Sequence, residues 1–238
     1  MKTSDKVYRS VGRGVAASRL GALLRALRPQ QWIKNGLVFL PFMFAIRQVW
    51  SMDDLDPVPG LIGRLLVVFA AFCSLSGGVY LFNDLVDRDV DRRHAVKRYR
   101  PIASGKVGVP VAVSAMLALV AAGLAAAFLV ESFLGAVCLL YIGINVSYSM
   151  GMKQVVLVDV FMVAAGYVIR TVAGAIAMDV TPSPWLYVTT AAAALFIVLG
   201  RRYAEVRLAG DSAVDQRTVL SKYAGPFIGQ LLLMSAAA

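Results

Sequence analysis

Most of the chain alternates between long apolar runs and short polar segments. Seven apolar runs can be distinguished, and several approach the roughly 20 residues that a helix needs to cross the hydrocarbon core of a bilayer. The pattern predicts an all-α, polytopic membrane helical bundle with about seven spans. The expected spans are residues 36–46 with an extension toward Trp50, 61–82, 107–130, 133–148, 155–178, 185–200 and 223–238.

The composition argues against a soluble globule. Of the 238 residues 59% are hydrophobic and 16% are charged, and the mean hydropathy is +0.70. Residues 1–35 are too basic, and too long before the first apolar run, for a cleavable signal peptide. We expect a basic cytoplasmic or interfacial arm at 1–35, with Trp32 at the membrane surface, and one transmembrane domain at 36–238. Cys73 and Cys138 lie in apolar runs, so we expect buried thiols.

The positive charge is concentrated on one predicted side of the membrane. The formal net charge is +10, and 21 of the 24 Lys and Arg residues fall in the arm and in the segments 83–106, 149–154 and 201–222. With seven spans all four segments share one side, which the positive-inside bias makes cytoplasmic. The basic balance therefore indicates a membrane surface and no nucleic-acid partner. We expect an inner-membrane protein with its polar site facing the cytoplasm.

An acidic motif closes the second predicted span. On a helix, Asn83, Asp84, Asp87 and Asp91 share one face because they are three or four residues apart, whereas Asp89 points elsewhere. Converging carboxylates repel one another unless a cation lies between them. Hard oxygen ligands that leave positions for water and phosphate suit Mg²⁺. The motif therefore predicts a magnesium site, against the alternative of a solvated loop whose charges pair with neighbouring Arg.

A basic run follows the acidic motif directly. Its cations could hold the anionic groups that such a metal bridges; they are Arg92, Arg93, Lys97, Arg98 and Arg100. Together the two segments predict a diphosphate site at the mouth of the bundle.

Further candidates lie around the fifth predicted span. Tyr148 and Lys153 flank the turn before it and Asp159 begins it; each is a functional residue or an interfacial anchor. Arg170 follows Asp159 by about three helical turns, roughly 16 Å deeper on nearly the same face. Because an ionisable residue at that depth is costly against lipid, Arg170 should face a polar cavity, an anion or a structural partner.

The polar segment after the sixth predicted span allows more than one role for its charged residues. Arg201 and Arg202 form either an ordinary positive flank or a second anion clamp. Asp211 and Asp215 could form a second, weaker metal face. His94, the single histidine, is interpreted as a solvated loop residue rather than a base.

The acidic motif resembles the N-D-x-x-D-x-x-x-D signature of the UbiA superfamily of intramembrane prenyltransferases. The closer likeness is to the decaprenyl-phosphate phosphoribosyltransferases, and it extends over most of residues 25–225. Five segments carry it: residues 27–35, 97–105, 157–160, 169–170 and 200–205.

The resemblance implies a helical bundle around a cavity that opens to lipid. It implies Mg²⁺-dependent transfer of phosphoribosyl from phosphoribosyl pyrophosphate to a polyprenyl phosphate, which releases pyrophosphate and feeds arabinose donors for the cell wall. Asn83, Asp84, Asp87 and Asp91 would hold Mg²⁺ and pyrophosphate. The other site residues that it implies are Lys97, Arg98 and Arg100 at phosphates, and Tyr148, Lys153, Asp159 and Arg170 at the ribosyl or lipid-phosphate end. We also expect Lys34, Arg201 and Arg202 to bind substrate.

The chain departs from the family pattern in three respects. The family usually has nine spans, whereas this chain ends near its seventh, so we expect a truncated bundle. The second Asp-rich motif of aromatic prenyltransferases is at best echoed by Asp211 and Asp215. The acidic phosphoribosyl-pyrophosphate loop of soluble phosphoribosyltransferases is missing from the sequence.

Two other functions stay open. The same fold could transfer a polyprenyl chain from its diphosphate to an aromatic or other acceptor. A transporter or membrane scaffold would be compatible with Arg170 and with a break near Pro182 and Pro184, but it gives the carboxylates no clear task. Assembly into a homo-oligomer also stays open.

Overall fold

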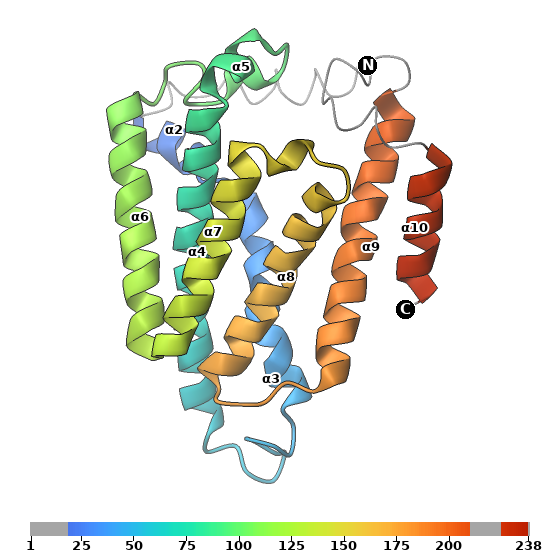
Figure 1. Cartoon of the computed structure of the whole chain (residues 1–238). Helices are drawn as coiled ribbons and strands as arrows, with labels where there is room; N and C mark the ends of the chain where they lie inside the picture. Colours follow the sequence, from blue (N-terminus) through green and yellow to red (C-terminus); the bar gives the residue numbers. More distant parts are fainter. Residues whose placement is uncertain (1–18, 210–224, 238) are drawn as a thin grey trace.

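The computed structural model describes residues 19–209 and 225–237, and the described part is helical apart from loops and two isolated bridges. Figure 1 shows the helices as an upright bundle. In chain order they are α2 (Arg19–Ala26), η1 (Pro29–Phe39), α3 (Leu40–Phe44), α4 (Val58–Val86), α5 (Arg88–Arg93), η2 (Lys97–Tyr99), α6 (Val109–Val130), α7 (Ser132–Met150), η3 (Met152–Gln154), α8 (Val158–Ala177), α9 (Pro184–Ala209) and α10 (Gly225–Ala237).

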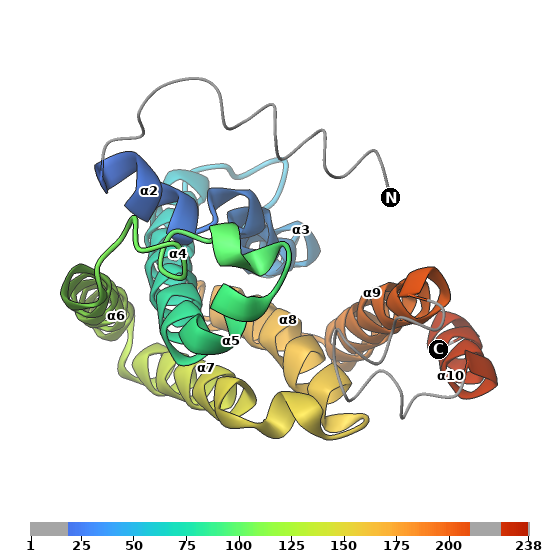
Figure 2. The same cartoon turned by 90° about the horizontal axis from the view of Figure 1, so that it is seen from above.

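Five of the described helices, α4, α6, α7, α8 and α9, are long and apolar enough to cross a membrane. They correspond to the second through sixth predicted spans, so the protein is an integral membrane protein with the predicted helical architecture. Seen from above, α6, α7, α8, α9 and α10 follow one another in an arc (Figure 2). The helices α2, η1 and α3 lie at the open side of this arc, next to α4. The central helices α4 and α8 are mostly buried, whereas α6 is mostly exposed toward lipid.

The first predicted span differs from the expectation. It is a 3₁₀ helix, η1, with Pro29 in its first turn, followed by the single α-helical turn α3. Because a 3₁₀ helix rises about 2.0 Å per residue, the two together rise about 30 Å despite their few residues. The extension toward Trp50 is wrong: the chain turns after Phe44, and the Trp50 ring folds back onto Phe42, with ring centroids 4.8 Å apart.

A close approach between η1 and α8 fixes how these helices pack. Gly174 faces the backbone of Val38, and a Cβ at this position would overlap the Val38 carbonyl oxygen. Only glycine therefore permits the contact. The core around Val38 includes Leu65, Phe72 and Leu75, so α4 is joined to the same packing.

The two ends of the bundle carry opposite charge. The acidic motif, η3 and the C-terminal part of α9 lie together at the upper end in Figure 1, with the basic run 92–100 beside the motif. The lower end carries the 45–57 loop, the α6–α7 turn and the α8–α9 connection. The acidic residues of these lower connections are Asp53, Asp54, Asp56, Glu131 and Asp179, beside a single cation, Arg47.

Candidate functional site

The predicted helix through the acidic motif forms with one joint. α4 ends at Val86 and α5 begins at Arg88, with Asp87 between them. Backbone hydrogen bonds continue across the joint: the Asp87 N–H donates to the Asn83 carbonyl and the Asp91 N–H donates to the Asp87 carbonyl. The motif residues therefore keep their helical spacing at the upper end of the bundle. Asp84 and Asp91 are 2% exposed.

Two arginines hold the buried carboxylates. Arg28 Nη2 lies 2.6 Å from Asp84 Oδ1, and Arg100 Nη1 lies 3.2 Å from Asp84 Oδ1 and 2.7 Å from Asp91 Oδ2. Because both oxygens contact one nitrogen at 3.2 Å and 2.7 Å, they are at most 5.9 Å apart. The guanidinium of Arg28 also lies over the Tyr80 ring, 5.2 Å from its centroid. Arg28 thus ties the end of the N-terminal arm to the motif.

Asp87 is held from the other side of the bundle. Its Oδ1 lies 2.6 Å from Lys153 Nζ, which belongs to η3 in the turn between α7 and α8. Both side chains are partly exposed. The structure thus brings Lys153 into contact with the acidic motif, a pairing that was not predicted; its role in a site stays a prediction.

The motif carboxylates suit a divalent cation, but the structure does not hold them in the arrangement of a finished metal site. Within residues 19–209 and 225–237 no three Asp, Glu, His or Cys side chains are clustered as a metal site. Two oxygens on one Mg²⁺ at about 2.1 Å are at most about 4.2 Å apart, and the oxygens of Asp84 and Asp91 that share Arg100 Nη1 are already within 5.9 Å of each other. Both already carry cations on their oxygens, and Mg²⁺ could replace these. The carboxylate chemistry therefore fits the ion.

A second charged cluster joins α8 to α9 at the same end. Asp159 is fully buried, with Oδ2 2.9 Å from Arg202 Nε, and Arg202 Nη1 lies 2.6 Å from Glu205 Oε2. Tyr148 lies within electrostatic reach of Arg202. Arg201 is largely exposed and contacts Glu205 at 3.1 Å. With Arg202 neutralised by two carboxylates, Arg201 is the more accessible cation of the predicted clamp.

Arg170 lies inside the bundle, as predicted from its depth, and is 6% exposed. It donates to Asn35 Oδ1 at 2.7 Å, to the Tyr141 hydroxyl at 2.9 Å and to the Gly166 carbonyl. Its guanidinium also lies over the rings of Phe72 and Tyr141. The structure therefore separates Arg170 from Asp159, which faces α9.

The remaining predicted residues are more dispersed. Arg98 is exposed and donates to the Tyr99 hydroxyl at 2.8 Å, away from the carboxylates. Lys97 is half-buried in η2. Exposed Asp89 pairs weakly with Arg92 at 3.6 Å, as expected of a residue off the motif face. Arg93 is exposed, Asn83 and Lys34 are half-buried, and Asp211 and Asp215 lie outside the described residues.

His94 ends α5 as a structural acceptor. Its Nδ1 accepts the backbone N–H groups of Val96 and Lys97. Burial lowers the pKa of His94, and the charge of Lys97 acts in the same direction. A neutral imidazole that accepts two hydrogen bonds agrees with the interpretation of a loop residue. Cys73 and Cys138 are buried free thiols, as expected.

Sequence reasoning did not assign four residues that the structure places in these clusters: Arg28, Asn35, Tyr141 and Glu205. A usable signal existed only for Arg28, which precedes Pro29 and so stands where one helix ends and the next begins. It adopts φ 53°, which is uncommon for a residue other than glycine. Leu157, directly before α8, has φ 66°. Such conformations often mark functional segments.

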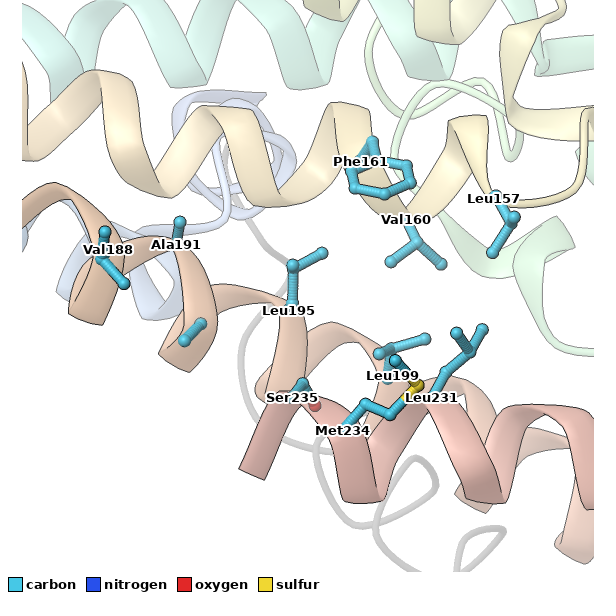
Figure 3. Close-up of a pocket in the computed structure, with 11 residues that line it drawn as sticks. Leu157, Val160, Phe161, Val188, Ala191, Leu195, Leu199, Leu231, Met234 and Ser235 are labelled. Atoms are coloured by element: carbon cyan, nitrogen blue, oxygen red, sulfur yellow. The ribbon is translucent and has the colours of Figure 1, made fainter. Parts of the chain in front are cut away.

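An apolar groove lies between α8, α9 and α10 (Figure 3). Its volume is about 410 Å³, and its lining includes Leu157, Val160, Leu195, Leu199 and Leu231. Apart from Ser235 its lining side chains are hydrocarbon or thioether. It suits hydrocarbon and offers nothing for phosphate.

Comparison with known proteins places the chain in a family. The model of the UbiA prenyltransferase family matches residues 38–237. The decaprenyl-phosphate phosphoribosyltransferase of Mycolicibacterium smegmatis is 33% identical over 94% of this chain and 70% of its own length. The protein of the same name from Mycobacterium tuberculosis is 31% identical over 93% of this chain and 72% of its own.

A solved structure shows the same fold. A UbiA homolog from Archaeoglobus fulgidus, bound to GPP and Mg²⁺, superimposes with a TM-score of 0.72 at 21% identity, covering 91% of this chain and 74% of that one. The family model spans most of the chain, and relatives above 30% identity align over more than two thirds of their own length. The chain therefore belongs to the UbiA prenyltransferase family of membrane transferases.

Proposed function

We propose that the protein transfers a 5-phosphoribosyl group from phosphoribosyl pyrophosphate to a polyprenyl phosphate such as decaprenyl phosphate, and releases pyrophosphate. Two relatives that align over most of the chain carry the name decaprenyl-phosphate phosphoribosyltransferase. The observation that carries the proposal is the pairing of all three motif carboxylates with cations at one end of the bundle. Such a cluster can exchange internal ion pairs for a metal and a diphosphate.

The acidic residues would bind the metal and the basic residues would bind the phosphates. Asp84, Asp87 and Asp91 would hold Mg²⁺, which supplies Lewis-acid neutralisation of the pyrophosphate when it is bound. Arg28, Arg100 and Lys153 are then free to hold phosphate oxygens, for which a guanidinium fork is well shaped. Positive charge at the leaving oxygen stabilises the negative charge that develops there.

The bond changes need no strong base. An oxygen of the lipid phosphate attacks C1 of the ribosyl group, and the bond from C1 to the pyrophosphate oxygen breaks. The nucleophile is already an anion, so no proton has to be removed from it. This agrees with a site in which the single histidine is a structural acceptor.

The orientation belongs to the same proposal. The basic upper end would face the cytoplasm, where phosphoribosyl pyrophosphate is available, and the acidic lower end would face outward. The membrane would be the inner membrane, and the product would supply arabinose donors for the cell wall. The charge difference between the two ends supports this orientation.

Prenyl transfer from a polyprenyl diphosphate is the competing function, because a UbiA homolog of the same fold binds GPP with Mg²⁺. One assay separates the two. Purified protein receives either labelled phosphoribosyl pyrophosphate with decaprenyl phosphate or labelled polyprenyl diphosphate with 4-hydroxybenzoate, each with Mg²⁺ or with EDTA. We expect a labelled transfer product, the polyprenylphosphoryl phosphoribose, only from the first pair and only with Mg²⁺, and no labelled prenylated 4-hydroxybenzoate from the second.

The variants Asp84→Asn and Asp89→Asn make the assay specific. Asp84 is buried in the motif, whereas Asp89 is exposed on the same short segment. Asp84→Asn should abolish transfer and Asp89→Asn should leave it near the wild-type rate. Product from the second pair alone, or transfer that withstands EDTA, would reject the proposal.

A further inference from the structure

A buried positive charge lies in the middle of the bundle, and the described residues include no acidic partner for it. Arg170 is 6% exposed, and its three hydrogen-bond acceptors are a side-chain amide, a phenol and a backbone carbonyl. None of the carboxylates in the described ranges forms an ion pair with it. A charge at this depth is costly unless something anionic offsets it, so the arrangement points to a bound anion.

The Arg170 guanidinium has more N–H groups than the hydrogen bonds described for it. It has five N–H groups, and the three hydrogen bonds take one hydrogen from each nitrogen. Within the described residues one hydrogen remains on Nη1 and one on Nη2. Two nitrogens of one guanidinium can bind a phosphate together, so these hydrogens remain available for an anion.

The surroundings are positive as well. Lys34 is half-buried in η1, and the charges of Arg201, Arg170 and Arg28 all act on it. An anion between Lys34 and Arg170 would be stabilised from both sides.

Asn35 fixes the orientation of Arg170. It is fully buried, and its Nδ2 donates to Cys73 Sγ and to Ser76 Oγ, each at 3.3 Å. Arginine Nε can only donate, so the Asn35 atom that faces it must be the amide oxygen. The packing of Gly174 on Val38 holds η1 against α8 at this level.

We propose that Asn35 is a positioning residue: by holding Nε of Arg170 it turns the free N–H groups toward a phosphate monoester of a bound substrate. Asn35 lies seven residues beyond Arg28, about 14 Å deeper along η1 by 3₁₀ rise. The subsite is therefore separate from the acidic motif. The identity of the substrate rests on the proposed function, in which a phosphate monoester occurs both at C5 of the ribosyl donor and at the head of the lipid.

Kinetics of Asn35→Asp test the proposal, with Ser76→Ala as the matched control. The carboxylate is nearly isosteric and still accepts from Nε, but it neutralises Arg170. Ser76→Ala removes another hydrogen bond of Asn35 and leaves the contact with Arg170. We expect Asn35→Asp to raise the KM of one substrate about 10-fold or more with kcat within about threefold, and Ser76→Ala to change neither.

The substrate whose KM rises identifies the source of the phosphate. If the KM for the lipid rises, the subsite takes the lipid phosphate; if the KM for the donor rises, it takes the 5-phosphate. Unchanged KM values, or an equal rise of both, would overturn the proposal, because a purely structural role has no reason to select one substrate.

A binding measurement keeps the test independent of turnover and of the folding of Asn35→Asp. The melting temperature of the wild type and of Arg170→Lys is measured with decaprenyl phosphate against decaprenol, and with ribose 5-phosphate against ribose. In one pair the phosphate-bearing compound should stabilise the wild type more than Arg170→Lys. Equal effects on both proteins would overturn the inference. A difference between them without any phosphoribosyl transfer would reject the proposed function alone.

Discussion

Arg100 joins two buried carboxylates, and its replacement by Gln tests how the acidic motif is held in the free protein. Its Nη1 lies 3.2 Å from Asp84 and 2.7 Å from Asp91. In Arg100→Gln, Asp84 keeps Arg28 at 2.6 Å, whereas Asp91 loses the ion pair that the structure shows for it. Removing one partner of a fully buried pair costs about 3–5 kcal/mol.

For Arg100→Gln we expect a smaller loss of unfolding free energy, because the Arg100 side chain is 27% exposed and solvent screens its ion pairs. We expect about 2 kcal/mol. For a chain of this size each kcal/mol shifts the melting temperature by about 2–4 °C. Arg100→Gln should therefore melt roughly 4–8 °C below the wild type, as estimated from the same relation.

The assay is thermal unfolding in detergent, followed with a thiol-reactive fluorescent dye. Cys73 and Cys138 are buried free thiols and react only when the bundle opens. The control is Arg92→Gln, which removes the exposed pair with Asp89 at 3.6 Å and one hydrogen bond to the Ala103 carbonyl at 3.1 Å, and should cost about 1 kcal/mol.

Magnesium adds a second reading. In the wild type the ion competes with Arg100 for the same carboxylates, so Mg²⁺ should raise the melting temperature of Arg100→Gln more than that of the wild type. A melting temperature of Arg100→Gln within about 1 °C of that of Arg92→Gln would be too small a shift for a lost buried pair. If, in addition, Mg²⁺ raises the melting temperatures of Arg100→Gln and of the wild type equally, Arg100 does not hold the motif.

Three further variants test the roles assigned to Asp87, Arg202 and His94. Asp87→Asn should reduce Mg²⁺-dependent turnover at least about 100-fold, because metal ligands contribute several kcal/mol to transition-state stabilisation; a steady-state assay with unchanged rate would exclude Asp87 from the site. Arg202→Met leaves fully buried Asp159 without this partner and should lower the free energy of unfolding by about 3–5 kcal/mol, measured as a lower melting temperature. The lowered pKa of His94 favours its neutral form in the folded state, so its stabilisation is present above pH 6.5 and is lost as the pH falls below 6.5 through the folded pKa. The difference in melting temperature between wild type and His94→Gln should therefore shrink in acid; a constant difference would contradict the assignment.

Apolar length is a local property, which is why the sequence located the membrane helices well. The predicted span 107–130 is α6, Val109–Val130. The predicted span 185–200 begins α9, but the helix continues to Ala209 because Arg, Ala, Glu and Leu after the span are good helix formers. Hydropathy marks where a helix leaves the membrane rather than where it ends. The 3₁₀ geometry of η1 had no comparable signal.

The pairings within the site depend on tertiary packing and could not be predicted. Arg28 and Asp84 are 56 positions apart, and Arg170 and Asn35 are 135 apart. The spacing on α8 predicted nearly the same helical face for Asp159 and Arg170, about three turns apart. Since α8 crosses its neighbours at an angle (Figure 1), Asp159 meets α9 while Arg170 meets η1 and α7.

In the proposed reaction the motif carboxylates exchange their internal cations for a divalent ion and a diphosphate. A structure of the protein with Mg²⁺ and phosphoribosyl pyrophosphate would show whether this exchange occurs. We expect a metal about 2.1 Å from oxygens of Asp84 or Asp87, with Arg28, Arg100 or Lys153 turned from carboxylate to phosphate. A bound donor elsewhere in the bundle, with the ion pairs at Asp84, Asp87 and Asp91 intact, would contradict it.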